Sequence, residues 1–76
     1  MVKQVLIDVA KALVTKPEEV VVNERTEGDY VHLELSVAPE DMGKVIGKQG
    51  RIAKAIRTLM KAAATKENKK VMVDIL

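Results

Sequence analysis

Two closely spaced glycines interrupt a helical pattern in the second half of this chain. The stretch Gly47-Lys48-Gln49-Gly50 lies between an apolar segment that ends at Ile46 and another that begins at Ile52. Because the stretch from one glycine to the other spans only four residues, the helix axes must turn sharply, and glycine allows the backbone angles and close approaches that such a turn requires. The chain is therefore constrained to place two helices at a tight corner.

Three further elements precede this corner. Apolar residues at three- and four-residue spacing predict an amphipathic helix over 2–14, which Pro17 ends. The β-branched residues of 20–22 and the alternating apolar and polar residues of 30–37 predict two strands. Glu27-Gly28-Asp29 supplies the residues of a tight reversal, so we expect an antiparallel hairpin. The side chains expected to face the core are Val31, Leu33, Leu35 and Val37.

The remaining residues predict two helices and a last strand. Pro39 and the two acidic residues after it favour a helix start, and a short helix follows over 42–46. A longer helix begins after Gly50, and a strand is predicted over 71–76. The sequence therefore predicts an α+β domain of order α-β-β-α-α-β, with a mixed three-stranded sheet covered by three helices on one face.

The length of 76 residues suits a single small domain, so we expect residues 1–76 to form one unit. A core of this size is marginal, and association with a partner would supplement it. The chain lacks cysteine, and charged residues interrupt the apolar residues near its start. No signal peptide or membrane span is therefore predicted, and a cytoplasmic location is expected.

The positive charges are concentrated in one segment, although the net charge is only +2. No acidic residue lies between the first and last members of the basic set Lys44, Lys48, Arg51, Lys54, Arg57 and Lys61. A solvated helix face would explain the pattern as well as a binding surface for an anion. Its position next to the glycine corner favours the binding surface.

The glycine corner itself has two interpretations. Glycine pairs commonly serve only to turn the chain. The same geometry at a helix N-terminus also exposes backbone N–H groups to a phosphate, and Lys48 and Arg51 would add positive charge. The motifs around the corner decide between them.

The run Val45-Ile46-Gly47-Lys48-Gln49-Gly50-Arg51-Ile52 resembles the I-G-x-x-G-x-x-I core of KH domains, which also lies between two helices. The extra helix and strand before the core resemble the type II, bacterial KH arrangement. Because the whole chain is accounted for, it is most similar to the small stand-alone bacterial KH proteins of the KhpA family.

This resemblance implies a single-stranded RNA-binding protein whose loop clamps the backbone of about four nucleotides. The RNA-binding positions that it implies are Gly47, Lys48, Gln49, Gly50, Val45, Ile46 and Ile52. Electrostatics adds Lys44, Arg51 and Lys54. Tyr30 is the only aromatic residue, so base stacking worth about 1–3 kcal/mol per base is expected to contribute little, and the affinity is expected to be modest.

The resemblance further implies RNA-chaperone activity, a homodimer, pairing with a larger Jag/KhpB-type KH protein, and an influence on cell-wall synthesis and cell shape. Two alternatives are a KH-fold protein-interaction module and a ribosome-associated assembly factor. An acidic or bulky loop would have favoured the interaction module, and Lys48 and Gln49 are neither.

The long helix offers a surface for the homodimer. Ile52, Ile56, Leu59 and Ala63 are expected to cover the sheet. The apolar stripe extends further, to the predicted dimer interface of Ala53, Met60 and Ala64. The alternative is that this flank packs against the first helix.

No enzyme chemistry is predicted. The lone histidine His32 lies on the polar side of its strand, so we assign it no metal or catalytic role. The carboxylates Asp8, Glu34 and Asp74 fall on different elements and lack a nucleophile partner, and no cofactor is expected.

Overall fold

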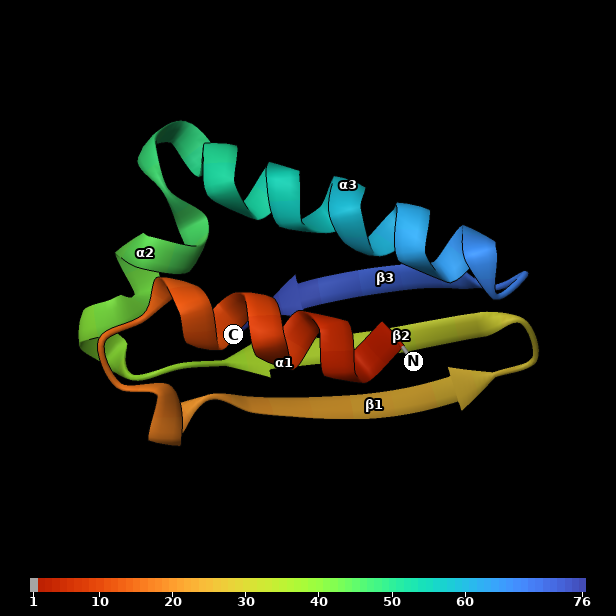
Figure 1. Ribbon diagram of the computed structural model, residues 1–76, viewed down its shortest axis with the longest axis horizontal. Coiled ribbons are helices and arrows are strands. Elements are labelled where there is room, and N and C mark those ends of the chain that lie inside the picture. Colours follow the sequence, from red (N-terminus) through yellow and green to blue (C-terminus); the bar gives the residue numbers. More distant parts are fainter. Residues whose placement is uncertain (1) are drawn as a thin grey trace.

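The computed structural model describes residues 2–76, and Figure 1 shows them as a sheet with helices packed on one side. The elements are α1 (Val2–Leu13), β1 (Val21–Glu27), β2 (Tyr30–Ser36), α2 (Met42–Ile46), α3 (Arg51–Lys66) and β3 (Lys70–Ile75). Short 3₁₀ turns occupy Pro17–Glu19, Pro39–Asp41 and Lys48–Gly50. The predicted α+β class and the order α-β-β-α-α-β are confirmed.

The sheet has the strand order β1-β2-β3, so β2 is central and β3 is an edge strand. β1 and β2 pair antiparallel through a two-residue turn, whereas β2 and β3 run parallel. Gly28 opens the turn with φ of +58°, which a residue without a Cβ adopts at no steric cost. The mixed sheet predicted from the sequence is therefore present.

One face of the sheet is covered by α1 and α3, and α2 continues this layer beyond the end of β2 (Figure 1). Leu33 and Leu35 of β2 are completely buried under these helices. Leu6 of α1 and Met60 of α3 are also inaccessible to solvent and belong to the same hydrophobic cluster. The predicted inward orientation of alternate β2 residues is confirmed, and no helix or strand of residues 2–76 covers the opposite face of the sheet (Figure 1).

The predicted dimer interface on α3 is wrong. Ala53, Met60 and Ala64 are buried within the monomer, and Met60 and Ala64 share the core cluster with Ala10 of α1. The reason is that α3 packs against both β3 and α1, so these side chains enter the core of the monomer itself. Leu59 was expected to cover the sheet but is 46% exposed, because it lies on the side of α3 that no other element covers.

No helix within residues 2–76 is long and apolar enough to cross a bilayer.

Candidate nucleic-acid interface

The corner between α2 and α3 is built from unusual backbone angles. Gly47 has φ +76° and ψ 173°, Gln49 has φ 59°, and Gly50 has φ 72° and ψ 15°. The N–H of Gly47 donates to the carbonyl of Gly43 at 2.8 Å, and the N–H of Gly50 donates to the carbonyl of Gly47 at 3.2 Å. These bonds close the corner and direct it away from the sheet (Figure 1).

The two glycines serve different purposes. A Cβ placed on Gly47 would lie 2.5 Å from Cγ1 of Ile52, so the corner packs too tightly there for any side chain. A Cβ placed on Gly50 would meet nothing within 4 Å. Gly47 is therefore required by packing, whereas Gly50 leaves an open surface of backbone that a ligand can approach.

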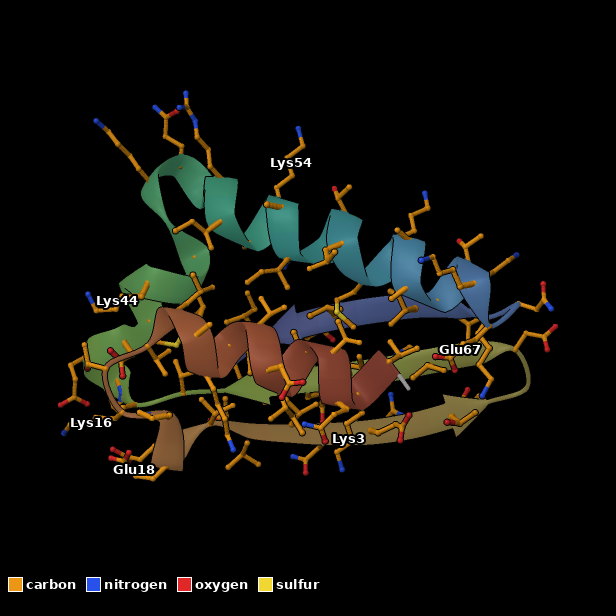
Figure 2. The ribbon with its side chains drawn as sticks, viewed as in Figure 1. Lys3, Lys16, Glu18, Lys44, Lys54 and Glu67 are labelled. Atoms are coloured by element: carbon orange, nitrogen blue, oxygen red, sulfur yellow. The ribbon has the colours of Figure 1, made fainter. Side chains whose placement is uncertain are left out.

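The start of α3 carries positive charge where a helix ordinarily favours negative charge. Its first turn has no acidic residue, and Arg51 and Lys54 are exposed there, next to Lys48 of the corner. The helix dipole adds a partial positive charge at this end, so the arrangement is unfavourable until an anion neutralises it. In Figure 2, Lys54 projects from α3 away from the sheet.

The predicted site residues divide into those that the structure places together and those that it does not. Lys48, Gln49 and Arg51 are exposed at the corner. Lys44 is exposed too, but it projects from α2 on a different side from Lys54 (Figure 2). Lys44 therefore contributes to the positive electrostatic potential around the corner, but it does not form one continuous surface with Lys54.

The aliphatic neighbours of the corner are less accessible than the prediction required. Val45 is completely buried in the core, so its assignment as an RNA contact is wrong: its side chain faces the sheet because α2 is one short turn packed on that side. Ile46 is 37% exposed, and Ile52 is half-buried beneath Gly47. Among the predicted aliphatic contacts within residues 2–76, these two offer apolar surface beside the corner.

A furrow runs along α3 where the helix overhangs the edge strand β3. Nε of Arg57 donates to the carbonyl of Val73 at 3.2 Å and ties the helix to this edge. The furrow encloses about 310 Å³, and its lining residues are Arg57, Lys61, Val71, Met72, Val73 and Asp74. Edge strands carry backbone groups without a strand partner, which can bond to the edges of bases.

Arg57 and Lys61 belong to the basic segment of the sequence, but they were not among the predicted RNA-binding residues. Helical periodicity placed them together with Lys54, but it could not show that their side of α3 faces the outer edge of β3. The hydrogen bond from Arg57 to Val73 supplies that information.

The buried carboxylate of Asp41 fixes the start of α2 and thereby the position of the corner that follows this helix. Asp41 is inaccessible to solvent and accepts hydrogen bonds from the N–H of Thr15 at 3.1 Å, the hydroxyl of Thr15 at 2.8 Å and the N–H of Lys16 at 3.0 Å. Beside it, Lys16 and Glu40 form an exposed ion pair at 3.0 Å. These contacts fix the start of α2 against the segment that follows α1.

Asp41 is ionised in this position. Removal from water acts to raise the pKa of its carboxyl, but the hydrogen bonds from Thr15 and Lys16 and the charge of Lys44 outweigh that effect and leave the pKa below its ordinary value. The hydrogen bond and charge of Lys16 likewise lower the pKa of Glu40. Sequence patterns gave no sign of this clamp, because its partners are 25 and 26 residues apart.

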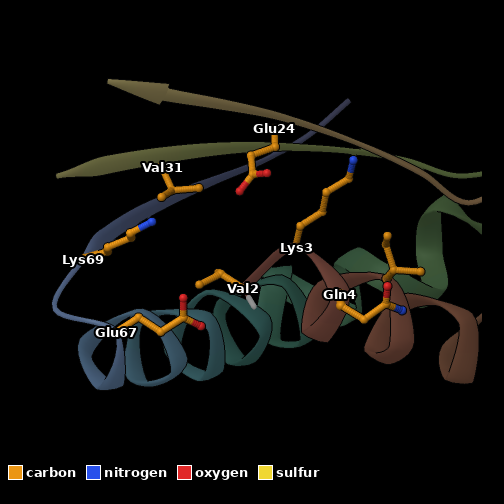
Figure 3. Close-up of a pocket in the computed structure, with 8 residues that line it drawn as sticks. Val2, Lys3, Gln4, Glu24, Val31, Glu67 and Lys69 are labelled. Carbon is orange, nitrogen blue, oxygen red and sulfur yellow. The ribbon is translucent and has the colours of Figure 1, made fainter. Parts of the chain in front are cut away.

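A separate hollow of about 450 Å³ lies at the other end of the molecule, near the start of α1 (Figure 3). Its charged lining residues have both signs: Lys3, Glu24, Glu67 and Lys69. A mixed rim favours no particular class of charged ligand. None of the described residues forms a cluster of three or more side chains suited to hold a metal ion.

Comparison with known proteins matches this architecture to one family. The family model described as "KhpA/KhpB, KH domain" matches residues 3–75. The chain belongs to this family. The glycine corner between α2 and α3 is thus the G-x-x-G loop of a type II KH domain, and the fold predicted from the resemblance is confirmed.

The sequences of several relatives align with nearly the whole of this KH domain. The RNA-binding protein KhpA of Clostridium acetobutylicum is 66% identical over 74 residues, which are 97% of this chain and 99% of that protein. The protein of the same name from Caldanaerobacter subterraneus is 65% identical over 68 residues, 90% of this chain and 91% of the relative. In Listeria monocytogenes the identity is 46% over 74 residues, 97% of each chain.

Proposed function

We propose that this KH domain binds single-stranded RNA and grips its backbone at the Gly47–Gly50 corner. The observation that carries the proposal is the open backbone at Gly50, where a Cβ would meet nothing, directly before a helix start that holds only positive charge. A phosphate in this position neutralises the helix dipole and the side chains of Lys48 and Arg51. The shared name of the relatives, RNA-binding protein KhpA, supports the same ligand.

Each element of the site has a part in this binding. The corner and the start of α3 hold phosphates, and they are indifferent to the sequence of the bases. Ile46 and Ile52 offer a small apolar surface to bases beside the corner. Bases further along the strand enter the furrow, where the backbone of β3 offers hydrogen bonds. The Asp41 clamp keeps α2, and hence the corner, in position for this contact.

The proposal is tested by reversing the charge of the loop. The double substitution Lys48→Asp with Gln49→Asp places two carboxylates where phosphates approach, so binding of a fluorescently labelled single-stranded RNA is expected to be lost. The fold is expected to persist, because both side chains are exposed and aspartate tolerates the left-handed backbone found at Gln49.

The chain offers a matched control. Lys3 and Gln4 form another exposed Lys–Gln pair, on α1. Changing both to aspartate alters the net charge equally at a place remote from the corner, and RNA affinity should fall far less. Equal affinity of the loop variant and the parent, with unchanged circular dichroism, would contradict the loop assignment and favour a protein-interaction module.

Self-association through α3 is part of the proposal, with a surface different from the one predicted. Ala55, Leu59 and Ala62 are exposed and lie at helical spacing on one stripe of α3. Small residues on either side of Leu59 permit close approach of a second helix. This stripe and the basic flank with Lys54 and Arg57 point in different directions, so a dimer leaves both RNA surfaces accessible.

The finer biological roles rest on the family resemblance. They are RNA-chaperone activity in the cytoplasm, pairing with a Jag/KhpB-type protein, and an influence on cell-wall synthesis and cell shape. These roles stay predictions, and crosslinking and sequencing of RNA bound in cells would identify the transcripts concerned.

A further inference from the structure

The one aromatic residue of the chain lies beside a basic hollow at the far end of α3. Tyr30 begins β2 and is 42% exposed. The hollow encloses about 520 Å³ and is lined by Tyr30, Lys61, Thr65, Lys69, Lys70, Val71 and Met72. Three of these described residues are lysines and none is acidic. The hollow therefore suits a ligand that has both a negatively charged group and a flat apolar ring.

The ring of Tyr30 is held by neighbours on the uncovered face of the sheet. Nζ of Lys70 lies 5.7 Å from the ring centroid, and the ring of His32 lies 6.2 Å away at an interplanar angle of 35°. These contacts restrict the ring before any ligand binds, which lowers the ordering cost of stacking. They also place the ammonium group of Lys70 close to the aromatic ring.

This hollow continues the furrow that runs along α3 beside β3. Both are lined by Lys61, Val71 and Met72, so they form one channel along the outer edge of β3. From Arg51 to Thr65 the helix rises about 21 Å, at about 1.5 Å per residue. At a stacked spacing of about 3.4 Å per nucleotide, roughly six nucleotides cover that length.

We propose that Tyr30 and its surrounding lysines form a second RNA subsite, which stacks one unpaired base of a strand already held at the glycine corner. The proposal rests on the proposed function. The ring receives a base, and Lys61, Lys69 and Lys70 neutralise the phosphates next to it. Because every base has an aromatic face, the subsite tolerates any sequence and selects instead for strand length and for the absence of pairing.

The intrinsic fluorescence of Tyr30 can report on stacking of a base against its ring. Tyr30 is the only tyrosine and the chain has no tryptophan, so intrinsic fluorescence reports on this ring alone. A single-stranded RNA of ten nucleotides is expected to quench that fluorescence, whereas a four-nucleotide strand bound at the corner leaves it unchanged. Both strands carry an end label, so that their affinities are measured separately by anisotropy.

Two substitutions separate stacking from other roles of the ring. Tyr30→Ala is expected to weaken binding of the ten-nucleotide strand by about 5- to 150-fold, which corresponds to the loss of one base–aromatic stack, and to leave the four-nucleotide strand unaffected. Tyr30→Phe keeps the aromatic face and should bind like the parent. Val21→Ala, at a strand position of β1 that is 50% exposed, serves as the control for truncation of an exposed side chain.

The outcomes distinguish this subsite from the site at the corner. Unchanged fluorescence together with equal binding of the long strand by the parent and Tyr30→Ala would overturn the subsite and leave the proposed function intact. An equal loss in Tyr30→Phe and Tyr30→Ala would overturn stacking as its basis. Failure of the parent to bind either strand would refute the proposed function and, with it, the subsite.

Discussion

Replacement of Gly47 by alanine is the most direct test of how the corner is built. The new Cβ would lie 2.5 Å from Cγ1 and 2.9 Å from Cβ and Cδ1 of Ile52, which is closer than carbon atoms approach in folded proteins. Gly47 also has φ +76° and ψ 173°, a region occupied almost only by glycine. The substitution therefore imposes both a clash and backbone strain.

The expected loss of stability follows from these two contributions. A side chain in that backbone region costs about 1–3 kcal/mol, and overpacking adds about 1–3 kcal/mol, so the free energy of unfolding should fall by about 2–6 kcal/mol. Small domains have a total stability of about 5–15 kcal/mol, so the variant is expected to be marginally folded.

Gly50→Ala is the matched control. Its φ of 72° and ψ of 15° lie in the left-handed helical region, and its Cβ would meet nothing within 4 Å. The expected cost is about 1–2 kcal/mol, from backbone strain alone. Urea unfolding followed by far-UV circular dichroism measures both variants, and the folded Gly50→Ala protein should still bind RNA more weakly because its methyl group covers the open backbone.

The role of Ile52 is tested in the same assay. Ile52→Ala removes Cγ1 and Cδ1, two of the three atoms that crowd the new methyl group. Combined with Gly47→Ala, it should cost less than the sum of the single losses, by about 0.5–3 kcal/mol. Equal destabilisation by Gly47→Ala and Gly50→Ala, or strictly additive losses with Ile52→Ala, would refute the clash as the reason for Gly47.

Further measurements test the charges, the clamp and the helix surfaces. The logarithm of RNA affinity should fall with the logarithm of salt concentration by about 0.7 per phosphate neutralised, so Lys54→Gln should flatten the slope by about that amount; an unchanged slope would remove Lys54 from the site. The pKa of Asp41 is lowered in the folded state, so its stabilisation is present above its unfolded pKa and is lost as pH falls through the folded value; urea midpoints of Asp41→Asn should therefore depend less on acidic pH than those of the parent, and parallel profiles would contradict this. Leu59→Asp should give a folded monomer in sedimentation, whereas Met60→Asp should unfold, because it places a charge in the core; a folded Met60→Asp protein would contradict the burial observed here.

Local patterns were enough to predict the order of the elements. The alternation along β2, the glycine turn at Gly28 and the helical spacing of α1 each depend on neighbours in the chain, and a residue's position relative to those neighbours fixes which way it points. The corner was predicted for the same reason, since two glycines within four residues interrupt the helical spacing of the apolar residues on either side. The family motif then indicated a ligand for that corner.

The tertiary structure decided which surfaces face solvent. A helical wheel gives the angles between side chains but does not show which neighbours surround the helix, so the burial of Met60 and the exposure of Leu59 depended on how α3 packs against β3 and α1. The burial of Val45 likewise follows from the side on which the single turn of α2 meets the core. The clamp on Asp41 and the hollow beside Tyr30 each join residues far apart in the chain, and such contacts exist only once the sheet and its helices are assembled.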